Sequence, residues 1–305
     1  MEEALLSQSS IINHQSSIHW APAKLNIRLK ITARRPDGYH ELVSIMVPVG
    51  LYDRLELQIT PFRRVEISCK GFSAPADEEN LACRAATAFF VYTGMNHGLS
   101  IKLTKNIPVS AGLGGGSSDA ACVLKALNQA LSCPLTAKEL AELALDLGAD
   151  VPFFLKERPC IARGIGEILE PIEKWPELWY VIIMPHIRVS TSWVYRKLNL
   201  SPSDRSKEIK LTNDEYQYNI TNLKEDPFVI SRILDNDLEK VTAARYPVIE
   251  SRKESLIKAG AEGALMSGSG PSVFGVFKSE EKAHQAKTSL ADSNPGDIFL
   301  VQGII

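Results

Sequence analysis

The segment from Pro108 to Ala121 carries the residue types and spacing that most clearly suggest chemistry. Four glycines fall within five positions, at Gly112 and Gly114–Gly116, and two serines follow directly. Glycine backbone can approach a ligand closely because it has no Cβ atom. The free N–H groups and the dipole at a helix start favour an anion. The segment therefore predicts a polyphosphate-binding loop, with a plain helix cap and flexible lead-in as the alternative.

This loop differs from the two common glycine-rich nucleotide motifs. No Gly-Lys-Ser/Thr follows the glycines, and a Gly-x-Gly-x-x-Gly pattern lacks its last glycine. Apolar residues alternate with polar ones over 99–103, as in a half-buried strand, and recur at helical spacing over 123–131. The unit is predicted to be strand, loop and helix, with Ser117 or Ser118 capping the helix.

Asp150 stands in the segment Gly-Ala-Asp-Val-Pro, residues 148–152, at a predicted turn. An aspartate two residues before a proline fits the start of a helical turn, where its side chain would act as a cap. The same carboxylate, held in a partly dry pocket, could accept a proton. The segment alone favours the cap, and the two roles are compatible.

A turn is predicted at Pro36-Asp37-Gly38, because proline presets φ, aspartate bonds locally and glycine accepts a positive φ. Tyr39 and His40 follow it at the start of the next strand. This pair fits ordinary packing and the holding of a planar base equally well.

The segment 21–31 alternates as a strand does, with leucine and isoleucine on one face and polar residues on the other. A solvated face explains Arg28 and Lys30. Lys24 and Asn26, next to the entry at Pro22, could also line a cleft.

A second loop of small residues, Ser-Gly-Ser-Gly-Pro at 267–271, lies between two apolar strands of the segment 264–277. Taken alone, it is typical of a tight turn. Together with the first loop, it could close over the same phosphates.

Patterning elsewhere predicts a mixture of strands and helices, with a cap at Asn80 and a capping box at Thr136 and Glu139. Strands are expected at 42–47, 55–59, 65–67, 181–184 and 299–301, and helices at 80–94, 136–148, 190–195, 230–238, 248–259 and 283–290.

The 305 residues are enough for about two domains and a substantial core. A net charge of −2 gives no positive field for nucleic acid or an anionic membrane. The five scattered cysteines, without a Cys-x-x-Cys pair, favour reduced thiols in the cytoplasm over disulfides or a zinc site.

Residues 1–17 lack the features of a signal peptide and are expected to be loosely ordered. The polar segment 201–226 is expected to be a variable excursion, and no apolar run approaches the roughly 20 residues of a membrane span.

Four motifs, taken in their order along the chain, resemble the galactokinase, homoserine kinase, mevalonate kinase and phosphomevalonate kinase superfamily. They are Pro-Ala-Lys-Leu-Asn at 22–26, the glycine loop, Gly-Ala-Asp-Val-Pro at 148–152 and Gly-Ser-Gly at 268–270. The resemblance runs from near Trp20 to near Phe277. It implies an α+β kinase of two domains, 18–172 and 173–305, with the active site in the cleft between them. The Asp-Gly-Tyr-His turn at 37–40 is absent from galactokinases and mevalonate kinases. It resembles the branch that phosphorylates the 2-hydroxyl of 4-diphosphocytidyl-2-C-methyl-D-erythritol in non-mevalonate isoprenoid biosynthesis.

The resemblance also implies roles for individual residues. Asp150 matches the catalytic base and Lys24 the lysine beside it. Asn26 matches a substrate contact. Tyr39 and His40 match residues that stack on and hydrogen-bond cytosine, and Tyr195 matches the aromatic on the other face of the base. The ATP phosphates would lie against Pro108, Val109, Ser110, Ala111, Gly112, Leu113, Gly114, Gly115, Gly116, Ser117 and Ser118, and against Gly268, Ser269 and Gly270.

Mg²⁺ is expected with ATP, and the sequence suggests no protein ligand for it. Ser110 and Ala111 stand where many relatives carry glycine, which stiffens the loop slightly. A monomer or weak homodimer is expected. The alternatives are a homoserine- or mevalonate-type kinase, or a catalytically silent relative that serves as a binding module.

Overall fold

The computed structural model describes residues 16–198, 230–293 and 296–305. Within these ranges, seven strands form one sheet in the order β3-β4-β2-β1-β8, with β5 paired to β2 and β6 to β5. The strands are β1 (Ser17–Arg34), β2 (His40–Thr60), β3 (Val65–Gly71), β4 (Gly98–Lys105), β5 (Cys160–Gly164), β6 (Ile168–Pro171) and β8 (Asp235–Asn236).

The two strands predicted at 42–47 and 55–59 are one continuous strand, β2. The reason is pairing with β1, which runs from Ser17 opposite Leu57 to Arg34 opposite His40. Shifts of register, one of them between Pro22 and Ala23, absorb the irregular stretch between the two predicted strands. The long hairpin carries polar residues of β1 across the middle of the molecule.

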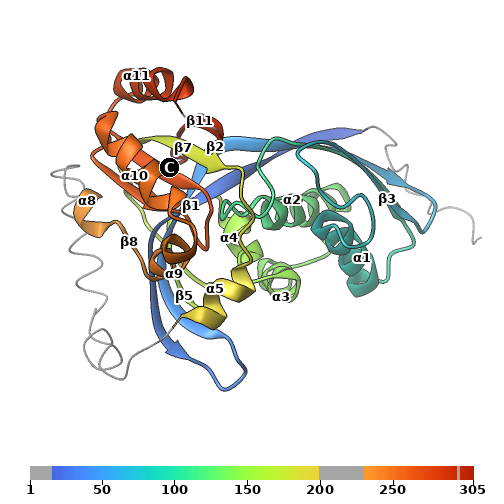
Figure 1. Cartoon of the computed structure of the whole chain (residues 1–305). Helices are drawn as coiled ribbons and strands as arrows, with labels where there is room; N and C mark the ends of the chain where they lie inside the picture. Colours follow the sequence, from blue (N-terminus) through green and yellow to red (C-terminus); the bar gives the residue numbers. More distant parts are fainter. Residues whose placement is uncertain (1–15, 199–229, 294–295) are drawn as a thin grey trace, which may run out of the picture.

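Four helices come from the same part of the chain as this sheet: α1 (Leu81–Thr93), α2 (Gly115–Ala130), α3 (Ala137–Leu147) and α4 (Val151–Lys156). Local signals place two of their starts as predicted. The Asn80 side chain accepts a hydrogen bond from the Ala82 amide, and Thr136 and Glu139 form the capping box. Figure 1 shows α1, α2 and α3 grouped on the side of the molecule where β3 lies. Their apolar faces share one core with the sheet, including Phe89, Leu124 and Phe153.

The second sheet contains, within the described residues, four antiparallel strands in the order β11-β7-β10-β9. They are β7 (Trp179–Pro185), β9 (Gly263–Met266), β10 (Val273–Phe277) and β11 (Gly296–Gln302). The helices α5 (Thr191–Lys197), α10 (Val248–Lys258) and α11 (Glu280–Ala291) follow the predicted positions. Figure 1 shows α10 and α11 at the end of the molecule opposite α1 and β3.

The single helix predicted over 230–238 is wrong. The chain forms α8 (Ile230–Ile233), the short strand β8, and then α9 (Asp237–Arg245). Asn236 is extended and its side chain caps α9 by accepting from the Leu238 amide at 3.0 Å. Asp235 and Asn236 pair in parallel with Arg28 and Leu29 of β1. The tertiary pairing with β1 therefore interrupts the helical pattern.

The prediction that Lys30 lies on a solvated face is also wrong. Its side chain is 12% exposed, and its Nζ atom lies 2.8 Å from carboxylate oxygens of both Asp235 and Asp237. These interactions raise the pKa of Lys30, against the opposing effect of burial. The expectations for residues 1–15 and 201–226 lie outside the described residues, and the boundary between 172 and 173 stays a prediction. None of the described helices has the length and apolar content needed to cross a bilayer.

Candidate active site

A cavity of about 1370 Å³ lies where the first sheet, the glycine loop, α5 and the second small-residue loop meet. Every predicted site residue lines it except Leu113, Ser118 and Gly270. The Leu113 side chain belongs to the apolar core, and Ser118 is buried in α2. The structure thus brings together residues that are spread over almost 250 positions of the sequence.

The glycine loop ends in the N-terminus of α2. Gly114 is the N-cap residue with a φ of 71°, and no side chain caps the helix. The prediction that Ser117 or Ser118 caps α2 is therefore wrong, because both lie inside its first two turns. The first N–H groups of an α-helix have no acceptor within the helix. Beside the cavity, these amides and the positive end of the helix dipole can bind an anion.

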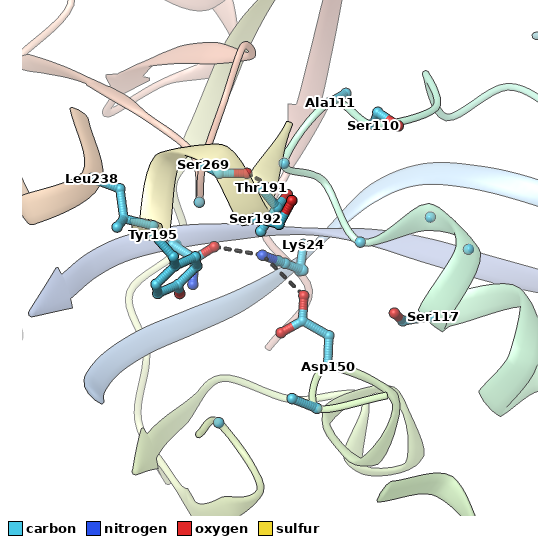
Figure 2. Close-up of a pocket in the computed structure, with 18 of the residues that line it drawn as sticks. Lys24, Ser110, Ala111, Ser117, Asp150, Thr191, Ser192, Tyr195, Leu238 and Ser269 are labelled. Atoms are coloured by element: carbon cyan, nitrogen blue, oxygen red, sulfur yellow. Dashed lines mark hydrogen bonds and ion pairs between the residues drawn. The ribbon is translucent and has the colours of Figure 1, made fainter. Parts of the chain in front are cut away.

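Lys24 and Asp150 face one another in this cavity, as Figure 2 shows. The Lys24 Nζ atom lies 3.5 Å from Asp150 Oδ2 and donates a hydrogen bond of 2.5 Å to Asn26 Oδ1. The Asn26 Nδ2 atom in turn donates to Ser44 Oγ at 2.8 Å. Lys24 is 4% exposed and the Asp150 side chain 41%. A buried ammonium thus lies beside a carboxylate that a substrate can reach.

Asp150 occupies the N-cap position of α4, yet its side chain makes no capping hydrogen bond. The predicted cap position is therefore confirmed, whereas the predicted capping hydrogen bond of the Asp150 side chain is absent. Pro152, in the first turn, needs no N–H partner there. The carboxylate is left directed toward Lys24, which suits acid–base chemistry better than a closed cap does.

The second small-residue loop is joined to the first by hydrogen bonds of Ser267 and Ser272. Ser267 Oγ donates to the Gly112 carbonyl at 3.0 Å and accepts from the Asn26 amide at 3.2 Å. The Ser272 amide donates to the Ala111 carbonyl at 3.1 Å. Ser267 therefore connects β1, the glycine loop and the second loop through one hydroxyl group.

Two residues that the sequence did not single out support the second loop from outside. The Asn236 Nδ2 atom donates to the carbonyls of Met266 and Gly268, each at 2.8 Å. Thr191 of α5 shares a hydrogen bond of 2.8 Å with Ser269, which Figure 2 also shows. No role was predicted for Asn236, because it lies inside the helix predicted over 230–238. An asparagine just before an acidic first turn is, however, a helix-start signal.

Three rings also line the cavity. Tyr39 is 59% exposed beyond the predicted turn, where its amide donates to Asp37 Oδ1 at 3.1 Å. The rings of His40 and Tyr195 are 5.2 Å apart, at an interplanar angle of 41°. Burial and, secondly, the charge of Arg34 lower the pKa of His40. Burial and the nearby Asp150 charge raise the pKa of Tyr195. Both rings are thus kept in their neutral forms at neutral pH.

No group of three His, Cys, Asp or Glu side chains within the described residues is arranged to hold a metal ion. A hard cation such as Mg²⁺ commonly binds through substrate phosphates and water with few protein ligands.

Comparison with known families finds two matches along the chain. The GHMP kinases N terminal domain matches residues 80–158, and the GHMP kinases C terminal domain matches residues 224–296. The first range contains the glycine loop and Asp150, and the second contains the loop that begins at Ser267.

Comparison with individual proteins gives matches to a named enzyme. The 4-diphosphocytidyl-2-C-methyl-D-erythritol kinase of Geobacter metallireducens is 45% identical over 93% of this chain and 98% of its own. The enzyme of the same name from Syntrophotalea carbinolica is 43% identical over 93% and 98%.

Among solved structures, a 4-(cytidine 5'-diphospho)-2C-methyl-D-erythritol kinase superimposes with a TM-score of 0.79 at 35% identity, over 95% of this chain and all of that one. A homoserine kinase from Cytophaga hutchinsonii superimposes with a TM-score of 0.71 over 93% and 94%. Its identity of 23% shows a shared fold alone.

Proposed function

We propose that this chain, which belongs to the 4-diphosphocytidyl-2-C-methyl-D-erythritol kinases of the GHMP kinase family, phosphorylates that cytidylated alcohol. The reaction transfers the γ-phosphate of ATP to the 2-hydroxyl of the alcohol. The predicted superfamily, the α+β fold and the kinase activity are confirmed by the same comparisons. The pairing of Lys24 with Asp150, across one cavity from the uncapped start of α2, is the observation that carries the proposal.

Asp150 is the proposed general base. Phosphoryl transfer depends on in-line positioning and stabilisation of charge more than on covalent chemistry by the protein. A positioned base that accepts the hydroxyl proton contributes about 10²–10⁴-fold. The Lys24 ammonium lies 3.5 Å from Asp150 and can stabilise the negative charge that develops on the attacking oxygen. Asn26 orients the ammonium through its amide oxygen.

The triphosphate of ATP is proposed to lie against the amides at the start of α2, with the loop from Ser267 closing over it. The free N–H groups there, and the hydrogen bonds that join the two loops, support this arrangement. Mg²⁺, bound through the phosphate oxygens, would neutralise part of their charge.

Tyr39, His40 and Tyr195 are the proposed contacts to cytosine. In Figure 2, Asp150 is drawn between Tyr195 and Ser117 of α2, so an alcohol at Asp150 would have a base on one side and a phosphate on the other. Aromatic rings stabilise a stacked base by about 1–3 kcal/mol. The rings of His40 and Tyr195 contact each other, so the face of His40 toward Tyr195 is already covered.

None of the five cysteines, all within the described ranges, is in a disulfide, which supports a reducing compartment such as the cytoplasm.

The deciding experiment incubates purified protein with ATP, Mg²⁺ and, in separate reactions, the cytidylated alcohol, homoserine and mevalonate. Phosphorylation of the cytidylated alcohol alone is expected, detected as product mass and ADP release. Phosphorylation of homoserine or mevalonate in its place, or of none of the three, would overturn the proposal.

A further inference from the structure

Three charged side chains are buried together beneath the glycine loop, and the proposed catalytic steps use none of them. Lys105 is 3% exposed, Asp53 is fully buried and Asp119 is 2% exposed. The Lys105 Nζ atom lies 2.7 Å from Asp119 Oδ2 and also donates to Asp53 Oδ2. Because these charges are almost entirely shielded from water, the geometry of their pairing matters far more than it would at the surface.

The cluster holds the entrance of the glycine loop. Lys105 is the last residue of β4, and Asp53 Oδ1 accepts hydrogen bonds from the amides of Asn106 at 2.6 Å and Ile107 at 2.8 Å. Those two residues directly precede the loop, which begins at Pro108. One carboxylate thus fixes the backbone where the strand becomes the loop.

The same cluster holds the exit of the loop. Asp119 stands four residues after Gly115, the first residue of α2, so the two lie on one face of the helix. A Cβ atom built on Gly115 would lie 2.9 Å from Lys105 Nζ, so the ammonium touches the helix start. Lys105 and Asp119 also line the cavity itself. Both ends of the loop are therefore tied to one ammonium group.

We propose that Lys105, Asp53 and Asp119 form a positioning cluster, which holds the phosphate-binding amides of the glycine loop in place before the nucleotide arrives. The inference rests on the proposed role of this loop in binding ATP. Preorganised donors bind an anion more tightly because no ordering of the loop opposes binding.

The charge of the cluster adds a second consequence. With all three groups ionised, the cluster carries a net charge of −1 next to the phosphates, and Asp119 Oδ1 has no hydrogen-bond partner among the described residues. The groups that face Asp119 are Lys105 of β4, Asp53 of β2, Cys69 of β3 and Cys122 of its own helix. Burial raises the pKa of Asp119 to about 8, with Lys105 opposing the rise and Asp53 adding to it. ATP should therefore bind more weakly once Asp119 loses its proton.

The first test measures dissociation constants by calorimetry for a non-hydrolysable ATP analogue and, separately, for the cytidylated alcohol. Asp119→Ala removes the tie to α2 and should weaken binding of the analogue by about tenfold or more, because a buried charged hydrogen bond is lost. Binding of the cytidylated alcohol should change by less than about twofold.

The matched control is Leu127→Ala, which opens a cavity at a buried position of the same helix, away from the loop. It should lower Tm while leaving the binding of the analogue within about twofold. Unchanged binding of the analogue to folded Asp119→Ala would overturn the proposal. Equal losses of binding in the two variants would also overturn it, because they would reduce the cluster to a general stabilising role.

The second test uses Asp119→Asn, which keeps the shape of the side chain and carries no charge at any pH. In the wild type, the dissociation constant of the ATP analogue should rise between about pH 7 and pH 9, and in Asp119→Asn this rise should be absent. A rise of equal size in both proteins would overturn the charge effect. If the wild type neither binds the analogue nor turns over ATP, the proposed function fails. If the wild type binds and the variants bind equally well, only the positioning cluster fails.

Discussion

The Lys24 Nζ atom lies 3.5 Å from Asp150 Oδ2, although 125 residues separate the two positions along the chain. Lys24 is on β1 and Asp150 immediately precedes α4. The Lys24 ammonium also donates a hydrogen bond to Asn26 Oδ1 on the same strand. The ammonium is thus fixed mainly by the first sheet, and the Asp150 carboxylate keeps free acceptor capacity for a proton.

Replacing Asp150 with Asn should lower kcat by about 10²–10⁴-fold, because an amide cannot accept the hydroxyl proton. The KM values for both substrates should change little, since the amide keeps the size of the carboxylate. Steady-state kinetics with each substrate varied in turn measures both quantities. Asp146→Asn, an exposed aspartate on the preceding helix, is the matched control and should behave as the wild type. Retention of wild-type kcat by Asp150→Asn would exclude Asp150 as the base.

Tyr39→Ala should raise KM for the cytidylated alcohol by about tenfold and leave KM for ATP nearly unchanged, because one stacked ring contributes about 1–3 kcal/mol. Tyr39 is 59% exposed, so its removal should not unfold the protein. Phe62→Ala, at a 75% exposed aromatic of another turn, should alter neither KM. Equal increases in the two KM values would contradict stacking by Tyr39.

Gly112→Ala should lower the free energy of unfolding by about 2 kcal/mol or more, through strain that the fold cannot relieve. Gly112 has a φ of 78°, and a Cβ atom there would lie 2.1 Å from the Ser267 carbonyl oxygen. Gly116→Ala is the matched control, because its Cβ atom would meet only Leu81 at 3.4 Å. Denaturant unfolding of the two variants should separate them, and equal stabilities would show that the contact between the two loops is not tight.

The stability of the protein should depend on the protonation of Asp119. Burial raises the pKa of Asp119 to about 8, whereas an unfolded aspartate titrates near about 3.9. Between these values the folded state keeps a proton that the unfolded chain has lost. The contribution of Asp119 to stability therefore falls as the pH rises, and levels off above about pH 8. Tm of the wild type should fall more steeply between about pH 5 and pH 8 than Tm of Asp119→Asn. Parallel curves for the two proteins would show that Asp119 does not titrate in this range.

Local patterns were enough to predict several turns and helix caps. The glycines at 112–116, the turn at 36–38 and the cap at Asn80 each follow from what a residue type permits in its own backbone neighbourhood. The capping box of Thr136 and Glu139 formed as predicted for the same reason. The motif order also indicated the superfamily, because each motif is short and continuous in the sequence.

Features that depend on distant partners were not predictable in this way. Ser117 and Ser118 resemble cap residues, yet the helix begins earlier, at Gly115, against the ammonium of Lys105. Lys30 resembles a solvated residue until β8 and α9 bring Asp235 and Asp237 to it.

Inspection of the amino-acid order was thus enough to suggest which residues can bind phosphate, accept a proton or turn the chain, because those properties belong to single residues and their neighbours. The tertiary structure alone decided that Lys24 faces Asp150, that Ser267 joins the two loops, and that a lysine and two aspartates are buried beneath one of them. The physical reason is that burial and charge pairing depend on strand register and helix packing between segments up to about 240 positions apart.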